Sequence, residues 1–550
     1  MAEPTEDRTA LVVGAGLVGT LCSAMLASRG WTVTLLESRS DPRLGSHAER
    51  ARSINLALSP RGIEALRSVS DELVDKVLKE GIEMRGRMVH KNKNKGKRAA
   101  DRPQDAEVET MGQDYGIVEQ GEVIRSISRT QLGIELLDHV DGLPKSGRGS
   151  VTTRFETKLV DMDLRQEGKV KVTLSTKGHA DDTKEEFDFV VGGDGAYSKV
   201  RRELMRGSLA RFDYKQFYAA HSYLELSIPP GPDNTFSIEP NYLHIWPRGE
   251  FMLIALANLD KSFTLTLFAH ETTFKDLDAQ LKQASTADTN PVIDLFRKEF
   301  PDALKLMGED ALMQSWRENP KDGLITVECS PYHYKNKVLL IGDSAHAMVP
   351  FYGQGMNCGF EDVRVLSSIL DHFSASPSPL VPSPLPYSSV TSELAPAPPS
   401  TSTSSSALGD RLALALEEYT RIRAPSLLAI QQLAHQNYAE MASSVLSPLY
   451  LVRLSLDSLL SKLFSLSVFN DATSSSDGGI RDRGGKWESL YRMTTFRCGI
   501  AYEEVIRRRE WQGRVLERLV AGAIAAVGTG IVGLGWWKLA PRTGFRIVRV

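Results

Sequence analysis

The sequence predicts an α/β fold with a parallel sheet that carries ligand-binding loops along one edge. Three glycine-rich segments, which begin near Gly14, Gly192 and Gly342, support this prediction. Each follows a short apolar run typical of a buried parallel strand and precedes residues with helical spacing. Strand carboxyl ends and helix amino ends form the crevice of such sheets, where an anionic ligand binds. We therefore expect the three segments to build one site.

The first segment contains a complete strand, helix and strand unit in "TALVVGAGLVGTLCSAMLASRGWTVTLLESR". Residues 9–13 predict the first strand, residues 17–29 the helix, and residues 31–36 a second strand that ends in Glu37. The glycines of the turn allow backbone amides to approach a pyrophosphate, and an acidic residue about 20 positions later can accept hydrogen bonds from a ribose. This unit predicts binding of an adenine dinucleotide.

The other two segments each place an aspartate after a strand. Residues 187–191 lead to Asp194, and residues 338–341 lead to Asp343. Taken alone, either Gly-Asp pair is equally well explained as an ordinary turn, but three such strand ends in one chain favour a shared site. His346 lies between two alanines after the third strand, and the pattern favours a structural role for it over a catalytic one.

Composition excludes several classes of protein. A chain of 550 residues with 41% hydrophobic and 25% charged residues is globular and long enough for two or three domains. Its net charge of -3 argues against a general nucleic-acid-binding protein. The four cysteines are scattered, so they indicate neither a zinc site nor a disulfide framework. The polar amino terminus shows no signal or transit peptide pattern.

The carboxyl-terminal run "LVAGAIAAVGTGIVGLGWW", residues 519–537, predicts a membrane anchor. As a helix it would span about 28 Å, close to the roughly 30 Å hydrocarbon core. It ends in two tryptophans and has arginines on both sides, which are typical interface residues. We therefore expect it to contact membrane lipid as a terminal anchor, with the catalytic body in the cytosol. The alternative is a buried core helix.

Two further segments are predicted to lack a fold of their own. Residues 91–113 begin with a basic stretch that could suggest nucleic-acid binding or nuclear import, but a solvated loop is the favoured interpretation. Residues 374–410 are rich in Ser and Pro and predict a disordered linker. A helical module is expected to follow at 411–512.

The three glycine-rich segments, together with Glu37 and Arg39, resemble the signature motifs of the single-component FAD-dependent aromatic hydroxylases of the para-hydroxybenzoate hydroxylase type. Further stretches resemble the members of this family that hydroxylate kynurenine, as does the apolar tail: "RSINLALSPRGIEAL", "MRGRMVH", "PFYGQGMNCGFED", "QNYAEM" and "LYRMTTF". The resemblance implies an FAD-binding domain at 9–200 and 330–373, with an inserted mixed β-sheet substrate domain at 201–329. Residues 82–125 are expected to be shared with that sheet.

The resemblance also implies an activity. It implies 3-hydroxylation of L-kynurenine in tryptophan catabolism, with O2 and NADPH as co-substrates, through a flavin C4a-hydroperoxide on non-covalently bound FAD. Because the sequence has no second dinucleotide-binding unit, NADPH is expected to bind transiently. Two alternatives stay open: a related flavin monooxygenase that hydroxylates another aromatic or epoxidises an alkene, and a membrane-tethered flavoprotein without catalysis. The resemblance further implies a location at the mitochondrial outer membrane.

The site residues implied by the resemblance form two groups. For substrate they are Arg87, Tyr115, Asn437 and Tyr491. For FAD they are Gly14, Gly16, Val18, Gly19, Glu37, Arg39, Ala57, Arg129, Leu159, Asp194, Asp343, Met356 and Asn357. Met356 and Asn357 are expected at the flavin ring, where the amino end of a helix favours the reduced, anionic flavin. Read alone, Arg87 could be a surface charge and Asn437 a polar residue on a helix face.

Overall fold

The computed structural model describes most of the chain: residues 8–45, 55–92, 108–115, 121–207, 211–283, 290–377, 394–396, 405–442 and 487–539, with short stretches between 445 and 461. The predicted solvated loop at 91–113 and the predicted linker at 374–410 lie largely outside these residues.

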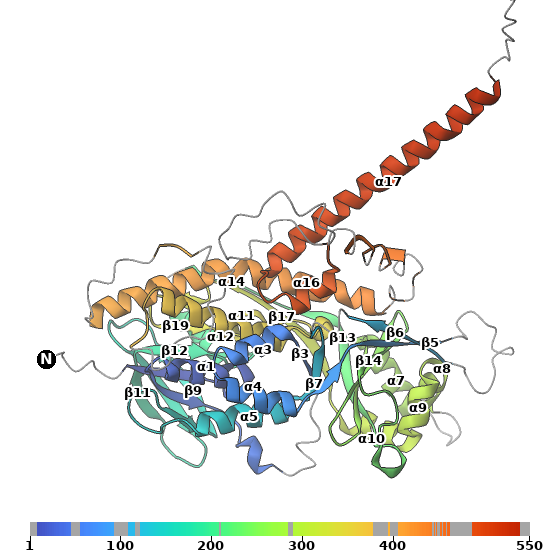
Figure 1. The fold of residues 1–550 in the computed structure, drawn as a ribbon. Coiled ribbons are helices and arrows are strands. Elements are labelled where there is room, and N and C mark those ends of the chain that lie inside the picture. Colours follow the sequence, from blue (N-terminus) through green and yellow to red (C-terminus); the bar gives the residue numbers. More distant parts are fainter. Residues whose placement is uncertain are drawn as a thin grey trace, which may run out of the picture.

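A six-stranded sheet forms the first half of the molecule (Figure 1). In spatial order its strands are β18 (His333–Tyr334), β19 (Val338–Leu340), β12 (Phe189–Gly192), β1 (Thr9–Val13), β2 (Thr32–Leu36) and β8 (Val151–Arg154). All neighbouring pairs are parallel except β18 with β19. The predicted first unit is confirmed, because α1 (Leu17–Ser28) connects β1 to β2. The strands before the three glycine-rich segments are adjacent in the order β19, β12, β1.

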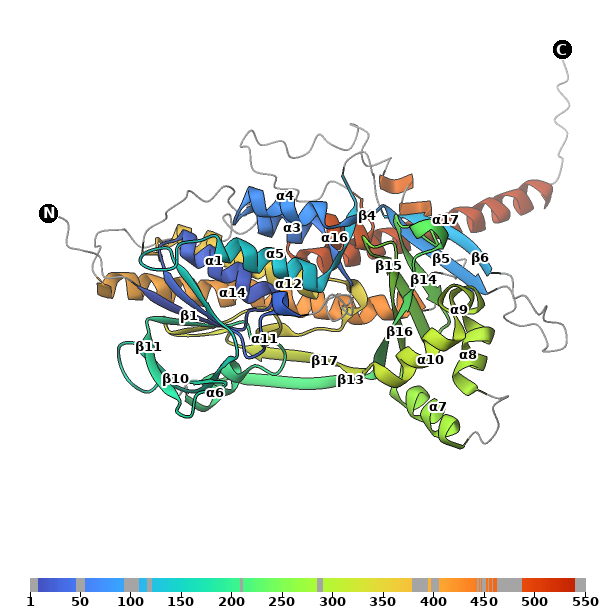
Figure 2. The ribbon, with the colours of Figure 1, turned by 90° about the horizontal axis from the view of Figure 1, so that it is seen from below.

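Helices cover one face of this sheet and a small antiparallel sheet lies on the other side (Figure 2). The helices are α1, α5 (Arg129–Asp141) and α12 (Gly355–His372). The small sheet consists of β11 (Thr183–Phe187), β10 (Val170–Thr176) and β9 (Thr157–Asp163). The central strands β1 and β12 are almost completely buried, which explains their continuous apolar sequences.

A seven-stranded mixed sheet forms the second half of the molecule. Its strands, in spatial order, are β17 (Lys321–Ser330), β13 (Asp213–Ile228), β16 (Phe263–His270), β15 (Phe251–Ala257), β14 (Tyr242–Pro247), β5 (Gly86–Asn92) and β6 (Val108–Asp114). Strand β5 pairs with β14 in parallel, and the other pairs are antiparallel. Strands β5 and β6 therefore share a sheet with the five strands β13 to β17. The exact domain boundaries stay predictions.

Connections join the two halves. A three-stranded sheet of β3 (Asn55–Leu58), β7 (Ile124–Ser128) and β4 (Ile82–Met84) lies between them, and the long strands β13 and β17 run from one half to the other (Figure 2). The outer face of the mixed sheet is covered by α7 (Glu271–Gln283), α8 (Pro291–Glu299), α9 (Pro301–Met307) and α10 (Glu309–Glu318). Trp246 and Trp316 are buried in the core beneath these helices.

The carboxyl-terminal helices pack across both halves. Helix α14 (Ser405–Ala442) extends for 38 residues along the body, and α16 (Leu490–Phe496) lies near its end (Figure 1). Helix α14 begins at Ser405, so the helical module starts earlier than the boundary predicted at residue 411. Tyr419 and Ile430 of this helix are fully buried against the body, which anchors the module.

The predicted membrane-spanning helix at residues 519–537 is wrong. These residues continue α17 (Tyr502–Leu539), which extends away from the body of the molecule in Figure 1. Within the described part of the chain, no helix is long and apolar enough to cross a membrane. The location at the mitochondrial outer membrane stays a prediction.

Candidate functional site

One cavity of about 860 Å³ connects the edge of the parallel sheet with the inner face of the mixed sheet. It is lined at one end by the glycine-rich strand ends that include Gly14, Asp194 and Asp343. Every site residue implied by the sequence lines this cavity except Gly19 and Asn357. Segments that are far apart in the chain therefore meet at a single site, as the order of the parallel strands requires.

The first glycine turn leaves space for a ligand at the amino end of α1. Gly14 has a φ of +100°, and a Cβ there would lie 2.6 Å from the carbonyl oxygen of Gly193. A Cβ on Gly19 would lie 2.0 Å from the Gly14 carbonyl oxygen, so Gly19 serves close packing rather than direct contact. A Cβ on Gly16, in contrast, would meet no atom within 4 Å. This open cradle at a helix amino terminus fits the pyrophosphate of FAD.

The end of β2 presents a buried carboxylate to the same cavity. Glu37 is 7% exposed, and its Oε1 accepts hydrogen bonds from the backbone N and the Nε of Arg39, both at 3.0 Å. The Arg39 side chain itself is 81% exposed. Glu37 is therefore held in place by Arg39 at the strand end where a ribose binds in folds of this class.

The two aspartates after β12 and β19 differ in their surroundings. The Asp194 carboxylate accepts hydrogen bonds from Ser198 Oγ at 2.6 Å and from the backbone N of Lys199 and Val200 at 2.6 and 3.1 Å. It therefore caps α6 (Lys199–Gly207), and its burial raises the pKa of the carboxyl although these hydrogen bonds lower it. Asp343, the first residue of α11 (Asp343–His346), is exposed on the cavity wall.

Asn357 does not line the cavity but forms hydrogen bonds with backbone groups of the residues near its wall. Its Nδ2 donates to the carbonyl oxygens of Ala57 and Gly353, both at 2.8 Å, and its Oδ1 accepts from the backbone N of Ser59 at 2.9 Å. The side chain is completely buried. Met356, one residue earlier in α12, lines the cavity instead. The amino end of α12 is thus fixed to the residues on either side of the expected flavin position.

The other end of the cavity gathers the four residues implied for substrate binding. Arg87 on β5 is 8% exposed; its Nε donates to Gln113 Oε1 at 2.9 Å, and its Nη2 lies 3.3 Å from Glu440 Oε1. Asn437 Nδ2 donates to the carbonyl oxygen of Phe351 at 2.7 Å, which ties α14 to the wall. This end therefore combines a guanidinium with a neighbouring carboxylate.

Three tyrosines form a stack beside Arg87. The ring centroids of Tyr115 and Tyr491 are 4.6 Å apart, and those of Tyr491 and Tyr352 are 5.7 Å apart. Burial raises the pKa of Tyr491 to about 12. Its phenol therefore stays protonated at neutral pH and is able to donate a hydrogen bond.

Sequence reasoning missed several members of this site. Glu440 lies three residues after Asn437 in the stretch "QNYAEM", so helical spacing alone would have placed both on one face of α14. Gln113 lies directly opposite Arg87 in the β5 and β6 pair. That register could not be read from the sequence, because the two strands are separated by a long segment without strand periodicity.

His346 belongs to a buried polar network rather than to the cavity. Its Nε2 lies 2.5 Å from Asp362 Oδ2, and both side chains are buried. Asp362 Oδ1 also accepts from Arg423 Nε and Nη2 at 3.0 and 2.7 Å. The structural interpretation of His346 is therefore consistent with its position.

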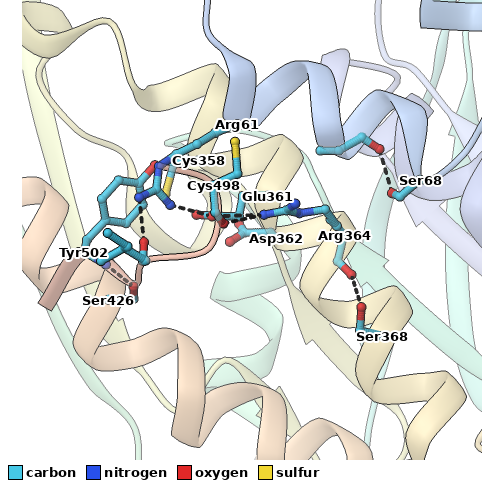
Figure 3. Close-up of polar contacts among 12 residues, drawn as sticks. Arg61, Ser68, Cys358, Glu361, Asp362, Arg364, Ser368, Ser426, Cys498 and Tyr502 are labelled. Carbon is cyan, nitrogen blue, oxygen red and sulfur yellow. Dashed lines mark hydrogen bonds and ion pairs between the residues drawn. The ribbon is translucent and has the colours of Figure 1, made fainter. Parts of the chain in front are cut away.

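The same network joins the carboxyl-terminal helices to the FAD-binding half (Figure 3). Arg61 on α3 (Pro60–Arg67) is fully buried and lies 2.7 Å from Glu361 of α12. Its Nε and Nη2 donate to the carbonyl oxygens of Thr494 and Ile500 at 2.8 and 2.6 Å, and its guanidinium lies 4.2 Å from the ring centre of Tyr502. Arg61 thus fixes α16, which carries Tyr491, against α12, which carries Met356.

Replacing Arg61 with methionine should lower the free energy of unfolding by about 3 to 5 kcal/mol, because it leaves the Glu361 carboxylate buried with one of its partners removed. The matched control is Arg67→Met on the same helix. The side chain of Arg67 is 36% exposed and pairs with Glu64 on that helix and with Asp71 at the start of α4 (Asp71–Lys79). The control should change the free energy of unfolding by less than about 1 kcal/mol. Denaturant unfolding followed by circular dichroism measures both, and equal midpoints would refute this role of Arg61.

The chain was compared with known protein families and sequences. A family model described as FAD binding domain matches residues 7–220 and 270–375. The kynurenine 3-monooxygenase of Cryptococcus neoformans is 38% identical and aligns over 96% of this chain and 96% of its own length. The enzyme of the same name from Candida albicans is 37% identical, with 98% and 99% covered. That from Saccharomyces cerevisiae is 34% identical, with 96% and 97% covered.

Solved structures show the same fold at much lower identity. The 2-methyl-3-hydroxypyridine-5-carboxylic acid oxygenase is 18% identical with a TM-score of 0.53, over 81% of this chain and 95% of that chain. PqsL from Pseudomonas aeruginosa is 19% identical with a TM-score of 0.54, over 80% and 97%. The glycine cradle, the cavity and the sequence similarity over nearly the full length of the chain all indicate the same family. The chain belongs to the kynurenine 3-monooxygenase family, whose FAD-binding domain it contains.

Proposed function

We propose that this protein is an FAD-dependent monooxygenase that converts L-kynurenine to 3-hydroxykynurenine, with O2 and NADPH as co-substrates. The full-length relatives that bear this enzyme's name support the proposal. The structural observation that carries it is Arg87, which lines the end of the cavity opposite the FAD cradle and pairs at 3.3 Å with Glu440 in the adjoining pocket.

Opposite charges at this distance suit the α-amino acid part of kynurenine. The guanidinium of Arg87 offers paired donors to a carboxylate, and Glu440 offers acceptors to an ammonium group. Tyr115 and Tyr491 extend the same wall with phenol groups that donate hydrogen bonds. A zwitterion bound here would direct its aromatic ring into the cavity, toward the strand ends that hold FAD.

Apolar residues surround the place where the ring would lie. Leu243, Ile254, Leu256 and Phe268 from the mixed sheet line the cavity between its two ends. FAD, when bound, supplies the reduction and activation of O2. The contribution of the chain is to hold the substrate ring in position and to exclude water. The amino group of the substrate itself activates the neighbouring ring carbon, so the chain needs no additional acid or base for that purpose.

The cradle and the strand ends would hold FAD. Gly16 and the amino end of α1 would face the pyrophosphate, Glu37 the ribose, and Met356 with the amino end of α12 the flavin ring. We propose that NADPH binds only transiently, because the one complete dinucleotide-binding unit in the sequence is assigned to FAD.

Substrate-stimulated NADPH oxidation by the purified protein tests this proposal. We expect L-kynurenine to stimulate oxidation strongly, and kynuramine, which lacks the α-carboxylate, to stimulate it far less. Stronger stimulation by another aromatic compound or by an alkene would favour the related monooxygenases. A protein that holds FAD and shows no stimulation by any of these compounds would be a non-catalytic flavoprotein.

A further inference from the structure

A second pocket of about 310 Å³ lies against the substrate end of the main cavity. The two share Arg87, Tyr115 and Tyr491, so these three side chains form the wall between them. On its other side the pocket is lined by residues from the carboxyl-terminal module, including Arg453 and, on α17, Arg509. We call it the entry pocket.

The entry pocket contains hydrogen-bond donors that have no acceptor. Gln113 Nε2, Arg453 Nη2 and Arg509 Nη1 are buried, and none of them has a hydrogen-bond partner among the residues that the structure describes. The orientation of the Gln113 amide is fixed, because its Oε1 accepts from Arg87 Nε. Burying such groups without acceptors is unfavourable. Three donors on one pocket wall therefore indicate a ligand rich in acceptor atoms.

The charges of the pocket indicate that this ligand is an anion. Arg453 and Arg509 share the single carboxylate of Asp457, at 3.2 Å and 3.7 Å, and Asp457 also accepts from Trp487 Nε1 at 2.8 Å. Two guanidinium groups thus face one carboxylate. Burial, and then the positive charge of Arg453, lower the pKa of Arg509, whereas the charges of Asp457 and Glu440 raise it.

The pocket also contains two further carboxylates, those of Glu440 and Asp114. Glu440 lies beside Arg87 and offsets its charge, and Asp114 lies on the rim. Asp114, Gln436 and Ala439 are exposed, so the pocket reaches solvent at this rim. An anion in the entry pocket would therefore lie between solvent and the Arg87 end of the main cavity.

We infer that the entry pocket binds the carboxylate of the incoming amino-acid substrate before that carboxylate passes to Arg87. This inference rests on the proposed function, since it takes the substrate to be an amino acid. Arg453 and Arg509 attract the carboxylate from solvent, and Gln113, held by Arg87, contributes a donor on the same wall. The stacked Tyr115 and Tyr491 separate the two positions.

The variants Arg509→Met and Arg453→Met test the inference. We measure the association and dissociation rates of L-kynurenine with the oxidised holoenzyme, from the change in flavin absorbance after rapid mixing. Because electrostatic steering as a whole raises association rates by about 10- to 1,000-fold, loss of one guanidinium should slow association by roughly 3- to 10-fold. Because the final substrate position at Arg87 is intact, the affinity and kcat should change by less than about twofold. The dissociation rate should therefore fall by about the same factor as the association rate.

Two controls separate this role from a structural one. Arg507→Met removes a charge from the same helix, and the side chain of Arg507 is 68% exposed and pairs with Glu504 outside the pocket, so association should be unchanged. Arg509→Lys keeps the charge and should restore most of the association rate. FAD content and the unfolding midpoint are measured for every variant.

The outcomes distinguish the inference from the proposed function. Unchanged association in both Met variants, an equal loss in Arg507→Met, or a change in dissociation alone would overturn the entry pocket. If a Met variant loses FAD, the Lys variant at the same position is measured in its place. A Lys variant that associates as slowly as a Met variant would also overturn the entry pocket. Failure of the unaltered enzyme to bind and hydroxylate L-kynurenine would instead overturn the proposed function.

Discussion

A Gly16→Val variant should fold and yet contain no FAD. A Cβ at Gly16 would meet no protein atom within 4 Å beyond its chain neighbours, so we expect a valine side chain to be accepted there without loss of the fold. It does project into the cradle at the amino end of α1, where the pyrophosphate needs close approach to the backbone. We expect loss of the flavin absorbance after gel filtration, together with an unchanged far-ultraviolet circular dichroism spectrum and loss of all flavin-dependent activity.

Gly14→Val provides the contrast. Its φ of +100° and the 2.6 Å approach of a Cβ to the Gly193 carbonyl oxygen mean that a side chain there strains the backbone and separates β1 from the β12 strand end. This variant should lose folded protein as well as FAD. Stoichiometric FAD in purified Gly16→Val would contradict the assignment of the cradle.

An Arg87→Met variant should keep FAD but lose affinity for L-kynurenine by at least about 10- to 150-fold, which corresponds to the loss of one charge-assisted hydrogen bond of about 1.5 to 3 kcal/mol. The effect should be larger if the Glu440 carboxylate, 3.3 Å from Arg87, then repels the substrate carboxylate. Tyr115→Phe should act in the same direction more weakly, because it removes a neutral donor. Titration followed by flavin absorbance, with steady-state kinetics, measures the affinity.

Arg85→Met is the matched control for Arg87. Arg85 is exposed two residues earlier in the chain, with its guanidinium 4.7 Å from the ring centre of Tyr242, and it does not line the cavity. Its replacement should leave affinity for L-kynurenine within about twofold. An Arg87→Met enzyme with the kinetic constants of the unaltered protein would show that the substrate carboxylate is held elsewhere.

The parts of the site that depend on local sequence were predictable. Glycine turns after apolar strands identified the cradle and the three strand ends, because turn geometry and strand burial are determined within short segments. The cross-strand pairing of Arg87 with Gln113 was not predictable, since it depends on the register of strands joined by a long segment. The entry pocket could not be predicted from the sequence either, because Gln113, Arg453 and Arg509 come together only through tertiary packing.

Two other features show why local patterns are insufficient. Arg61 lies in the stretch "RSINLALSPRGIEAL", but its role depends on Glu361 and on two carbonyl groups more than 400 residues away. The length and flanking arginines of the carboxyl-terminal run predict a membrane span, but the described part of the chain contains no helix that is long and apolar enough to cross a membrane.

We expect the enzyme to hydroxylate L-kynurenine in this cavity with an oxygen atom from O2. The most direct test is to incubate the purified holoenzyme with L-kynurenine, NADPH and 18O2, and to analyse the product by mass spectrometry. We predict 3-hydroxykynurenine that contains one 18O atom, formed in an amount equal to the NADPH consumed. NADPH consumption without a hydroxylated product, or a hydroxyl oxygen that derives from water, would contradict the claim.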